Sequence, residues 1–424
     1  MSFFTYNNGV LNAEKVPLSD IAARVGTPFY CYSSAALLHS YQALEEEFAN
    51  KGGVDICYSV KANSNLAVVA TLAAAGAGAD VVSEGELRRA LAAGIPSDCI
   101  VFSGVGKTDR ELIAGLEAGI AQFNVESEPE LERLNALACE RQCEAPVALR
   151  INPDIDAQTH EKITTGRSDN KFGIDWRTAQ ALYGRGVAMA GVHMIGIGLH
   201  IGSQITTLTP FEEAFQLLAS LVTAVRADGH EVSRLDLGGG LGVPYEPGGG
   251  LTFSLTEYAD MIEKTLGSLG CCHILEPGRF LAAQAGALVA SVVYEKEGEH
   301  NSLLIIDAAM NDLIRPALYN ARHTILPVRE VSQDTLVQFY DVVGPICETS
   351  DVMARYYPLP PCRAGDLIAL MDTGAYGAVQ ASTYNSRPLV PEVMVQGRDM
   401  AIIRPRQSLE ELLAMDTMPD WLEP

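Results

Sequence analysis

From about residue 34 the chain alternates between short apolar runs and amphipathic stretches of helical period. Eight strands alternating with helices over about 245 residues match the usual size of a (β/α)8 barrel. An open doubly wound sheet is the alternative, and the count of eight favours the barrel. The predicted strands are Asp55–Val60, Ala79–Ser83, Ile100–Ser103, Gln122–Val125, Val147–Ile151, Ile195–His200, Arg234–Leu237 and Cys272–Leu275.

Two helices between these strands have recognisable start signals. Ser34 is the expected N-cap of a helix that runs to about Asn50. Between the sixth and seventh strands, Thr209 is the expected N-cap, Pro210 the first helical residue and Gly229 the stop.

The pattern changes after Phe280, where β-like runs follow one another with few helical stretches between them. This texture predicts a separate, mostly antiparallel β domain. We therefore expect a barrel over residues 34–280 and a β-sandwich or β-barrel domain formed by 1–33 and 281–424. Its expected strands are Val289–Tyr294, Leu303–Asp307, Thr335–Val343, Leu367–Asp372 and Glu392–Gln396, joined by Phe3–Tyr6 and Pro28–Tyr32 from the N-terminal segment.

The composition indicates a globular protein and argues against nucleic-acid-binding and membrane-spanning proteins. The net charge of −23 argues against a nucleic-acid partner, and 48% hydrophobic residues fit a globular core. The longest apolar stretch, Ala67 to Ala79, is too short to cross a membrane, and no signal peptide is expected. The nine cysteines form no C-x-x-C pair, which predicts neither a metal site nor a disulfide framework. A cytoplasmic protein is expected.

Polar residues and glycines follow the ends of the predicted strands, where (β/α)8 enzymes carry their chemistry. Loops after the seventh and eighth strands of such barrels often bind phosphate. The candidates are Lys61, Asp80, Arg150, His200, Ser203, Gly238, Gly239, Gly240, Glu276, Gly278 and Arg279.

These residue types can supply the parts of a pyridoxal 5′-phosphate (PLP) site. A desolvated lysine such as Lys61 can form a Schiff base with an aldehyde. The triplet Gly238 to Gly240 lets backbone N–H groups approach a phosphate. Glu276 can keep a pyridine nitrogen protonated. Each has a simpler interpretation when taken alone: a surface lysine, a turn, and a glutamate paired with Arg279.

Three segments of the predicted β domain carry further candidates. Arg315 and Tyr319 lie four residues apart around a proline. Cys347 and Glu348 are neighbours in a loop after a strand, and Tyr376 is bracketed by glycines. Alone they would be a surface arginine, a buried cysteine and a turn tyrosine.

Taken in order from Thr27 to Pro388, these segments resemble the fold-type III PLP-dependent decarboxylases, and most closely those that act on diaminopimelate. The resemblance implies that Lys61 carries PLP as an imine, His200 packs on the ring and Glu276 pairs with the pyridine nitrogen. Asp80 and Arg150 are further cofactor-binding candidates. Residues implied at the phosphate are Ser203, Gly238, Gly239, Gly240, Gly278, Arg279 and Tyr376.

The resemblance further implies conversion of meso-2,6-diaminopimelate to L-lysine and CO2. Cys347 is the implied proton donor, supplied by the partner subunit of a homodimer. The second amino-acid head of the substrate needs a cation for its carboxylate and an anion for its ammonium. Residues implied in substrate binding are Arg279, Arg315, Tyr319, Glu348 and Tyr376.

Three alternatives stay open. A decarboxylase of the same fold could act on ornithine, arginine, carboxynorspermidine or a D-amino acid. A racemase of the barrel family is disfavoured, because such racemases resemble a pattern with arginine at the pyridine nitrogen. A non-catalytic PLP-binding homologue would tend to lose Lys61 or Cys347, and both are present.

Overall fold

The computed structural model describes residues 3–155, 170–245, 250–298, 302–332 and 334–422. The chain divides into two compact units, 37–282 and 1–36 with 283–424. The domain limits expected from the sequence stay a prediction. None of the helices in the described ranges is long and apolar enough to span a bilayer.

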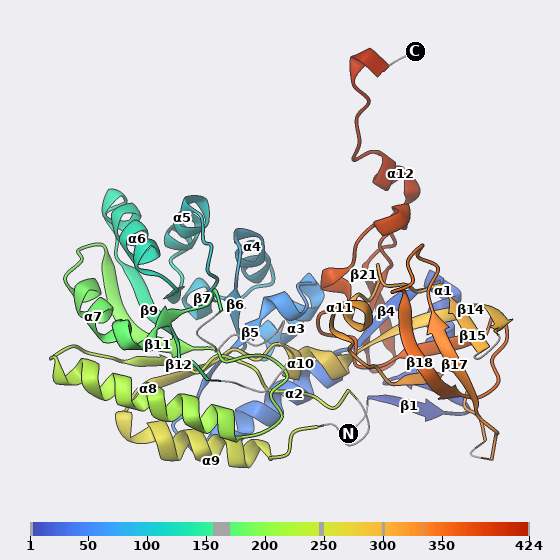
Figure 1. Ribbon diagram of the computed structural model, residues 1–424, viewed down its shortest axis with the longest axis horizontal. Helices are drawn as coiled ribbons and strands as arrows, with labels where there is room; N and C mark the ends of the chain where they lie inside the picture. Colours follow the sequence, from blue (N-terminus) through green and yellow to red (C-terminus); the bar gives the residue numbers. More distant parts are fainter. Residues whose placement is uncertain (1–2, 156–169, 246–249, 299–301, 333, 423–424) are drawn as a thin grey trace. The chain divides into compact units, whose positions relative to one another are not determined.

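The first unit is a closed barrel of eight parallel strands, as predicted (Figure 1). Each strand pairs with the next, β8 pairs with β9, and β13 closes the ring by pairing with β5. A short strand, β10 (Ile174–Asp175), adds to the edge of β9. The barrel strands are β5 (Asp55–Ser59), β6 (Gly78–Val81), β7 (Ile100–Phe102), β8 (Gln122–Val125), β9 (Ala145–Asn152), β11 (Val192–Leu199), β12 (Arg234–Asp236) and β13 (Cys272–Leu275).

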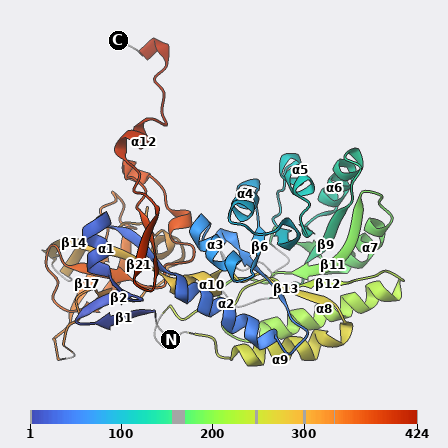
Figure 2. The ribbon, with the colours of Figure 1, turned by 180° about the vertical axis from the view of Figure 1, so that it is seen from behind.

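Helices cover the outside of these strands, as the two opposite views show (Figures 1 and 2). Several begin at a serine or threonine whose side chain accepts a hydrogen bond from the third helical residue, as Ser83, Thr108, Ser127 and Ser254 do. The helices are α2 (Ser34–Phe48), α3 (Leu66–Ala74), α4 (Glu84–Ala92), α5 (Asp109–Ala118), α6 (Glu128–Glu140), α7 (Trp176–Val187), α8 (Thr209–Ala227) and α9 (Leu255–Leu266).

Both expected N-caps were wrong by one residue. Helix α2 is capped by Ser33, whose Oγ accepts a hydrogen bond from the Ala36 N–H at 3.0 Å. Helix α8 already includes Thr209, follows Leu208 and has no side-chain cap. Neighbouring polar residues offer alternative starts, and backbone geometry chooses between them.

The second unit is built on a long central strand, β14 (Gly286–Glu297), which pairs antiparallel with β4 (Phe29–Ser33), β15 (Ser302–Ile306) and β19 (Leu367–Leu370). Two pairings, β15 with β17 and β4 with β20, are parallel. The sheet is therefore mostly antiparallel, as predicted. Its other strands are β16 (Ile325–Pro327), β17 (Gln338–Val343), β18 (Val352–Leu359), β20 (Glu392–Gln396) and β21 (Asp399–Arg404).

The N-terminal segment joins this unit in two ways. Strand β4 lies inside the large sheet, as expected. Strands β1 (Phe4–Asn7), β2 (Val10–Ala13) and β3 (Val16–Pro17) form a separate small sheet beside α1 (Leu18–Val25), visible in Figure 2. Phe4 and Leu11 from the small sheet share a core with Val289 and Val393 of the large one. The expected run Phe3–Tyr6 therefore joins the core of the unit without joining its main sheet.

Candidate active site

Lys61 lies directly beyond the end of β5, in the short turn Val60–Ala62. Its Nζ donates to Asp80 Oδ2 at 2.6 Å, and Ser59 Oγ donates to the same oxygen at 2.7 Å. Asp80 is fully buried on β6. Burial acts to raise the pKa of this carboxyl, but the charge and hydrogen bond of Lys61 outweigh it and hold the pKa below its usual value. The site thus contains an ionised carboxylate that orients the amine.

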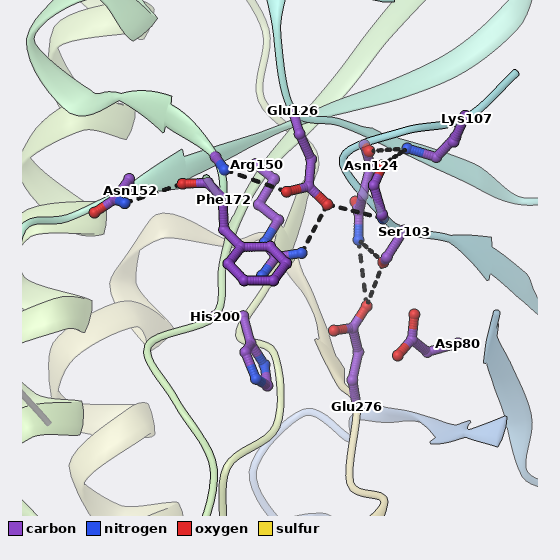
Figure 3. Close-up of polar contacts among 12 residues, drawn as sticks. Asp80, Ser103, Lys107, Asn124, Glu126, Arg150, Asn152, Phe172, His200 and Glu276 are labelled. Atoms are coloured by element: carbon purple, nitrogen blue, oxygen red, sulfur yellow. Dashed lines mark hydrogen bonds and ion pairs between the residues drawn. The ribbon is translucent and has the colours of Figure 1, made fainter. Parts of the chain in front are cut away.

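Glu276 follows β13 and points into the barrel interior toward Ser103 and Asn124 (Figure 3). Its Oε1 accepts from Asn124 Nδ2 at 3.2 Å and from Ser103 Oγ at 3.4 Å. Burial first, and then the charge of Asp236, raise the pKa of Glu276 well above its usual range. Both effects favour the protonated form of Glu276.

The triplet Gly238 to Gly240 forms a tight turn after β12. A Cβ on Gly239 would lie 2.2 Å from the backbone oxygen of Glu276, and one on Gly238 would lie 2.4 Å from that of Leu199. Gly238 and Gly240 also have positive φ angles of 65° and 111°. Only glycine fits this turn, which packs its backbone closely against the ends of β11 and β13.

His200 follows β11 and contacts the glycine turn. Its Nδ1 accepts a hydrogen bond from the Gly239 N–H at 3.1 Å, so this nitrogen carries no proton. Burial, followed by the charges of Arg150 and Lys61, holds the pKa of His200 well below its usual value. The ring is partly exposed and neutral, which suits it to stack on a planar ligand.

Arg279 begins the short helix α10 (Arg279–Ala282) after β13 and is 7% exposed. Its guanidinium donates to Ser203 Oγ at 2.9 Å and to the Tyr245 hydroxyl at 2.6 Å. Gly278 lets the chain after β13 pass close to the end of β5, because a Cβ there would lie 2.9 Å from the Ser59 side chain. The structure thus brings together Ser203 and Arg279, and it adds Tyr245, which the sequence analysis did not single out.

A buried ion-pair network that includes Arg150 and Glu126 is drawn in the same close-up as His200 and Glu276 (Figure 3). Arg150 NH1 donates to Glu126 Oε1 at 2.7 Å, and the Gly173 N–H donates to Glu126 Oε2 at 3.2 Å. The Arg150 guanidinium also lies over the Phe172 ring at 5.2 Å. Sequence analysis missed Glu126, although it follows β8 as directly as Glu276 follows β13. The network fixes Arg150, so this arginine holds the strand ends together.

Lys107 and Glu130 extend the network away from the barrel axis. Lys107 Nζ is 2.7 Å from Glu130 Oε1, and their side chains are 1% and 7% exposed. Lys107 also donates to the backbone oxygens of Gly104 and Asn124. A buried lysine with three acceptors is a structural clamp on the loop after β7.

In the β unit, Arg315 opens helix α11 (Arg315–Tyr319) and is 5% exposed. Its NH1 lies 2.9 Å from His323 Nε2, and His323 Nδ1 lies 2.8 Å from the Met371 carbonyl oxygen. Because a carbonyl only accepts, Nδ1 of His323 carries the proton and Nε2 accepts from Arg315. His323, which sequence analysis did not identify, therefore positions this arginine.

Tyr319, Cys347, Glu348 and Tyr376 lie in the same unit. Cys347 is an exposed free thiol whose backbone N–H donates to Asn385 Oδ1 at 3.0 Å. Glu348 is exposed and accepts from the Tyr384 hydroxyl at 2.7 Å. Tyr319 ends α11, and Tyr376 is partly exposed with a positive φ of 56°.

Comparison with known proteins places these residues in a family. Residues 35–283 match the model for the pyridoxal binding domain of pyridoxal-dependent decarboxylases. The diaminopimelate decarboxylase of Zymomonas mobilis is 46% identical over 421 residues, covering 99% of each chain. The enzyme of the same name from Vibrio cholerae is 46% identical over 420 residues, again covering 99% of each chain.

Solved structures agree. Diaminopimelate decarboxylase from Helicobacter pylori, complexed with L-lysine, matches with a TM-score of 0.90 at 39% identity, covering 94% of this chain and 98% of that one. The enzyme from M. jannaschii, also in complex with L-lysine, matches with a TM-score of 0.93 at 36% identity and covers 99% of both chains. This chain belongs to the diaminopimelate decarboxylase family of pyridoxal-dependent enzymes.

Proposed function

We propose that this chain uses PLP, held on Lys61, to convert meso-2,6-diaminopimelate to L-lysine and CO2. The observation that carries the proposal is the amine of Lys61 at 2.6 Å from a buried carboxylate, inside the segment that matches the pyridoxal binding domain. Similarity to diaminopimelate decarboxylases along the whole chain supports the choice of substrate.

The residues of the barrel fit the proposed cofactor. The turn Gly238 to Gly240 leaves no room for any Cβ, and its last residue, Gly240, is partly exposed at the strand end, where its backbone can approach a phosphate. Arg279 and Ser203 add a cation and a hydroxyl at the neighbouring strand end. Lys61 supplies the amine for an aldehyde, and Glu276 supplies an acid for a ring nitrogen. Gly278 and Tyr376 complete the proposed phosphate contacts.

When bound, PLP supplies an electron sink for the bond between the substrate α-carbon and its carboxylate. Glu276 would hold a proton at the ring-nitrogen end of the site, because its buried acid can supply one there. His200, neutral and hydrogen-bonded to the glycine turn, would cover one face of the ring. Asp80 orients the Lys61 amine, and Arg150 holds the neighbouring strand ends through Glu126.

We assign the distal end of the substrate to residues that match its charges. Arg315 is a buried guanidinium held in place by His323, and together with Arg279 it can bind a carboxylate bidentately. Hydrogen bonds from Tyr384 and Ser350 hold the pKa of the exposed Glu348 below its usual value, so it is an anion suited to an ammonium. Tyr319 and Tyr376 are the proposed hydroxyl donors.

We further propose that Cys347 donates the proton that replaces CO2 at the α-carbon. An exposed thiol can meet a substrate carried by another copy of the chain, which supports a homodimer with sites shared between subunits. All nine cysteines are free thiols, which supports a reducing location such as the cytoplasm.

The decisive experiment is CO2 release from a panel of meso-diaminopimelate, ornithine, arginine and lysine, with PLP added. We expect release from meso-diaminopimelate alone, and none from the Lys61→Ala variant. Release from ornithine or arginine instead would show that the chain is a decarboxylase of the same fold with a different substrate. No release from any substrate by PLP-loaded protein would support a non-catalytic homologue.

A further inference from the structure

Asp236 and Glu276 form a pair of buried carboxyl groups in the barrel interior. Asp236 is the last residue of β12 and is 2% exposed, while Glu276 follows β13 and is 5% exposed. One amide bridges them, because Asn124 Nδ2 lies 2.7 Å from Asp236 Oδ2 and 3.2 Å from Glu276 Oε1, and the two side chains also hydrogen-bond each other. The two acids are therefore close neighbours on adjacent strands.

Neither acid of the pair forms an ion pair with a residue that the structure describes, and the charge of Lys61 only partly offsets the burial of Glu276 and the charge of Asp236. Among the described residues, the ion pairs inside the barrel join Lys61 to Asp80, Lys107 to Glu130 and Arg150 to Glu126, and none reaches Asp236 or Glu276. His200, at the strand ends, is neutral. Two ionised carboxylates side by side in a buried site are unfavourable. The pair therefore holds one proton at neutral pH.

The hydrogen bonds decide which acid carries that proton. Asp236 accepts three N–H donors, from Asn124, from Gln122 Nε2 at 3.3 Å and from the Gly238 backbone at 3.0 Å. Such donors favour the ionised form. The Glu276 carboxyl accepts the longer bond from Asn124 and a hydroxyl at 3.4 Å from Ser103, and its side chain also hydrogen-bonds Asp236, an interaction that raises the pKa of Glu276 and lowers that of Asp236. The proton therefore resides on Glu276, and Asp236 is the carboxylate.

We propose that Asp236 is a positioning residue whose negative charge keeps Glu276 protonated, so that Glu276 brings its own proton to the ring nitrogen of PLP. This inference rests on the proposed function. As the cofactor binds, the O–H bond of Glu276 breaks and an N–H bond forms on the ring. The carboxylate left on Glu276 then faces the cationic ring, and no proton is taken from water. Asp236 stays ionised throughout.

Infrared spectroscopy of the full-length protein stripped of PLP provides the test, because a buried protonated carboxylic acid has its own C=O stretch. We expect this band at neutral pH in the wild type, lost in Glu276→Gln and lost when PLP is added. In Asp236→Asn, the pH at which the band disappears should fall by roughly one unit or more, since a neighbouring charge is gone. Asn can still accept from the Gly238 N–H.

The matched control is Gln122→Met, which removes a hydrogen bond to Asp236 but leaves its charge. Equal shifts in both variants would indicate a purely structural role, whereas the proposal requires a clearly larger shift in Asp236→Asn, which alone removes the charge. If Asp236→Asn does not fold, Asp236→Ser removes the same charge with a smaller side chain. Equal midpoints in the wild type and the charge-removing variant would overturn the proposal.

The wild-type spectrum is informative on its own. Absence of the Glu276 band at neutral pH, in protein without PLP, would also overturn the proposal, whether or not any variant folds. The band needs no turnover, so its failure is distinguishable from failure of the proposed reaction, which would appear as absent CO2 release with the band present.

Discussion

At the residue scale, the protonation state of each titratable group in the site depends on its burial and on its charged neighbours. Lys61 favours the ionised form of Asp80. Burial and then the charge of Asp236 favour the protonated form of Glu276. Desolvation and the charges of Arg150 and Lys61 favour the neutral form of His200. The barrel thus combines an amine (Lys61), a carboxylate (Asp80), a carboxylic acid (Glu276) and a neutral imidazole (His200). A pyridine cofactor such as PLP needs an amine at its aldehyde, an acid at its ring nitrogen and a neutral group on its ring face.

The state of His200 has a measurable pH dependence. Its pKa in the folded protein is depressed below the unfolded value of about 6.5. Its contribution to the free energy of unfolding is therefore complete above about pH 6.5 and is lost as the pH falls, because the unfolded chain binds the proton more readily. Nuclear magnetic resonance should show no titration of the His200 ring between pH 8 and 5, with its signals assigned by loss in His200→Gln. A midpoint near 6.5 would contradict this.

Site residues that directly follow a strand could be predicted from the sequence. Site residues that depend on contacts between distant parts of the chain could not. Lys61 and Glu276 could be chosen because each directly follows a strand. The protonation of Glu276 depends on Asp236 and Asn124, which come from other strands and meet it only in the closed barrel. His323 could not be chosen, because only the folded β unit brings it to Arg315.

At the element scale, the barrel was predictable and the edges of the β unit were not. The prediction of eight buried apolar strands does not depend on their exact limits. An edge strand is harder to predict, because its pattern of apolar residues is weaker. Strand β18 carries exposed Arg355 and Tyr356, and β21 is mostly exposed, so neither has the apolar signal of a core strand. The glycine turn after β12 was recognised because its position relative to a strand, and not its composition, marked it.

The glycine turn can be tested directly. In Gly239→Ala, the new methyl group would lie 2.2 Å from the backbone oxygen of Glu276, so the turn must open. Overpacking of this kind costs about 1–3 kcal/mol, and PLP affinity should fall by roughly tenfold or more. Equilibrium binding of PLP measures the effect. Gly106→Ala is the control, because a Cβ there meets nothing within 4 Å. Equal affinities in the two variants would exclude a role for the turn.

At the scale of the whole molecule, the proposed residues divide between two compact units. Lys61, His200 and Glu276 belong to the barrel, while Cys347 and Arg315 belong to the β unit. The alternation of strands and helices along the sequence predicted the first unit. The end of this alternation after Phe280 predicted the second unit. The assembly of subunits leaves no comparable periodic signal in a sequence.

Mixing two inactive variants tests the proposed assembly. If Cys347 serves the Lys61 of a partner subunit, a mixed dimer of Lys61→Ala and Cys347→Ala has one intact site. With free exchange of subunits, about one quarter of wild-type CO2 release should return, since half the dimers are mixed and each has one working site. Cys99→Ala, which removes an exposed barrel thiol, should stay active on its own. No recovery after verified exchange would rule out a shared site.

The most direct test of the account is chemical labelling of Lys61. Borohydride reduction of the PLP-loaded protein should fix the cofactor to one nitrogen, and mass mapping should find it on the peptide that contains Lys61. The same treatment of Lys61→Ala should leave that peptide unlabelled. A label on another lysine of the wild type, or none at all in protein that releases CO2, would contradict the central claim.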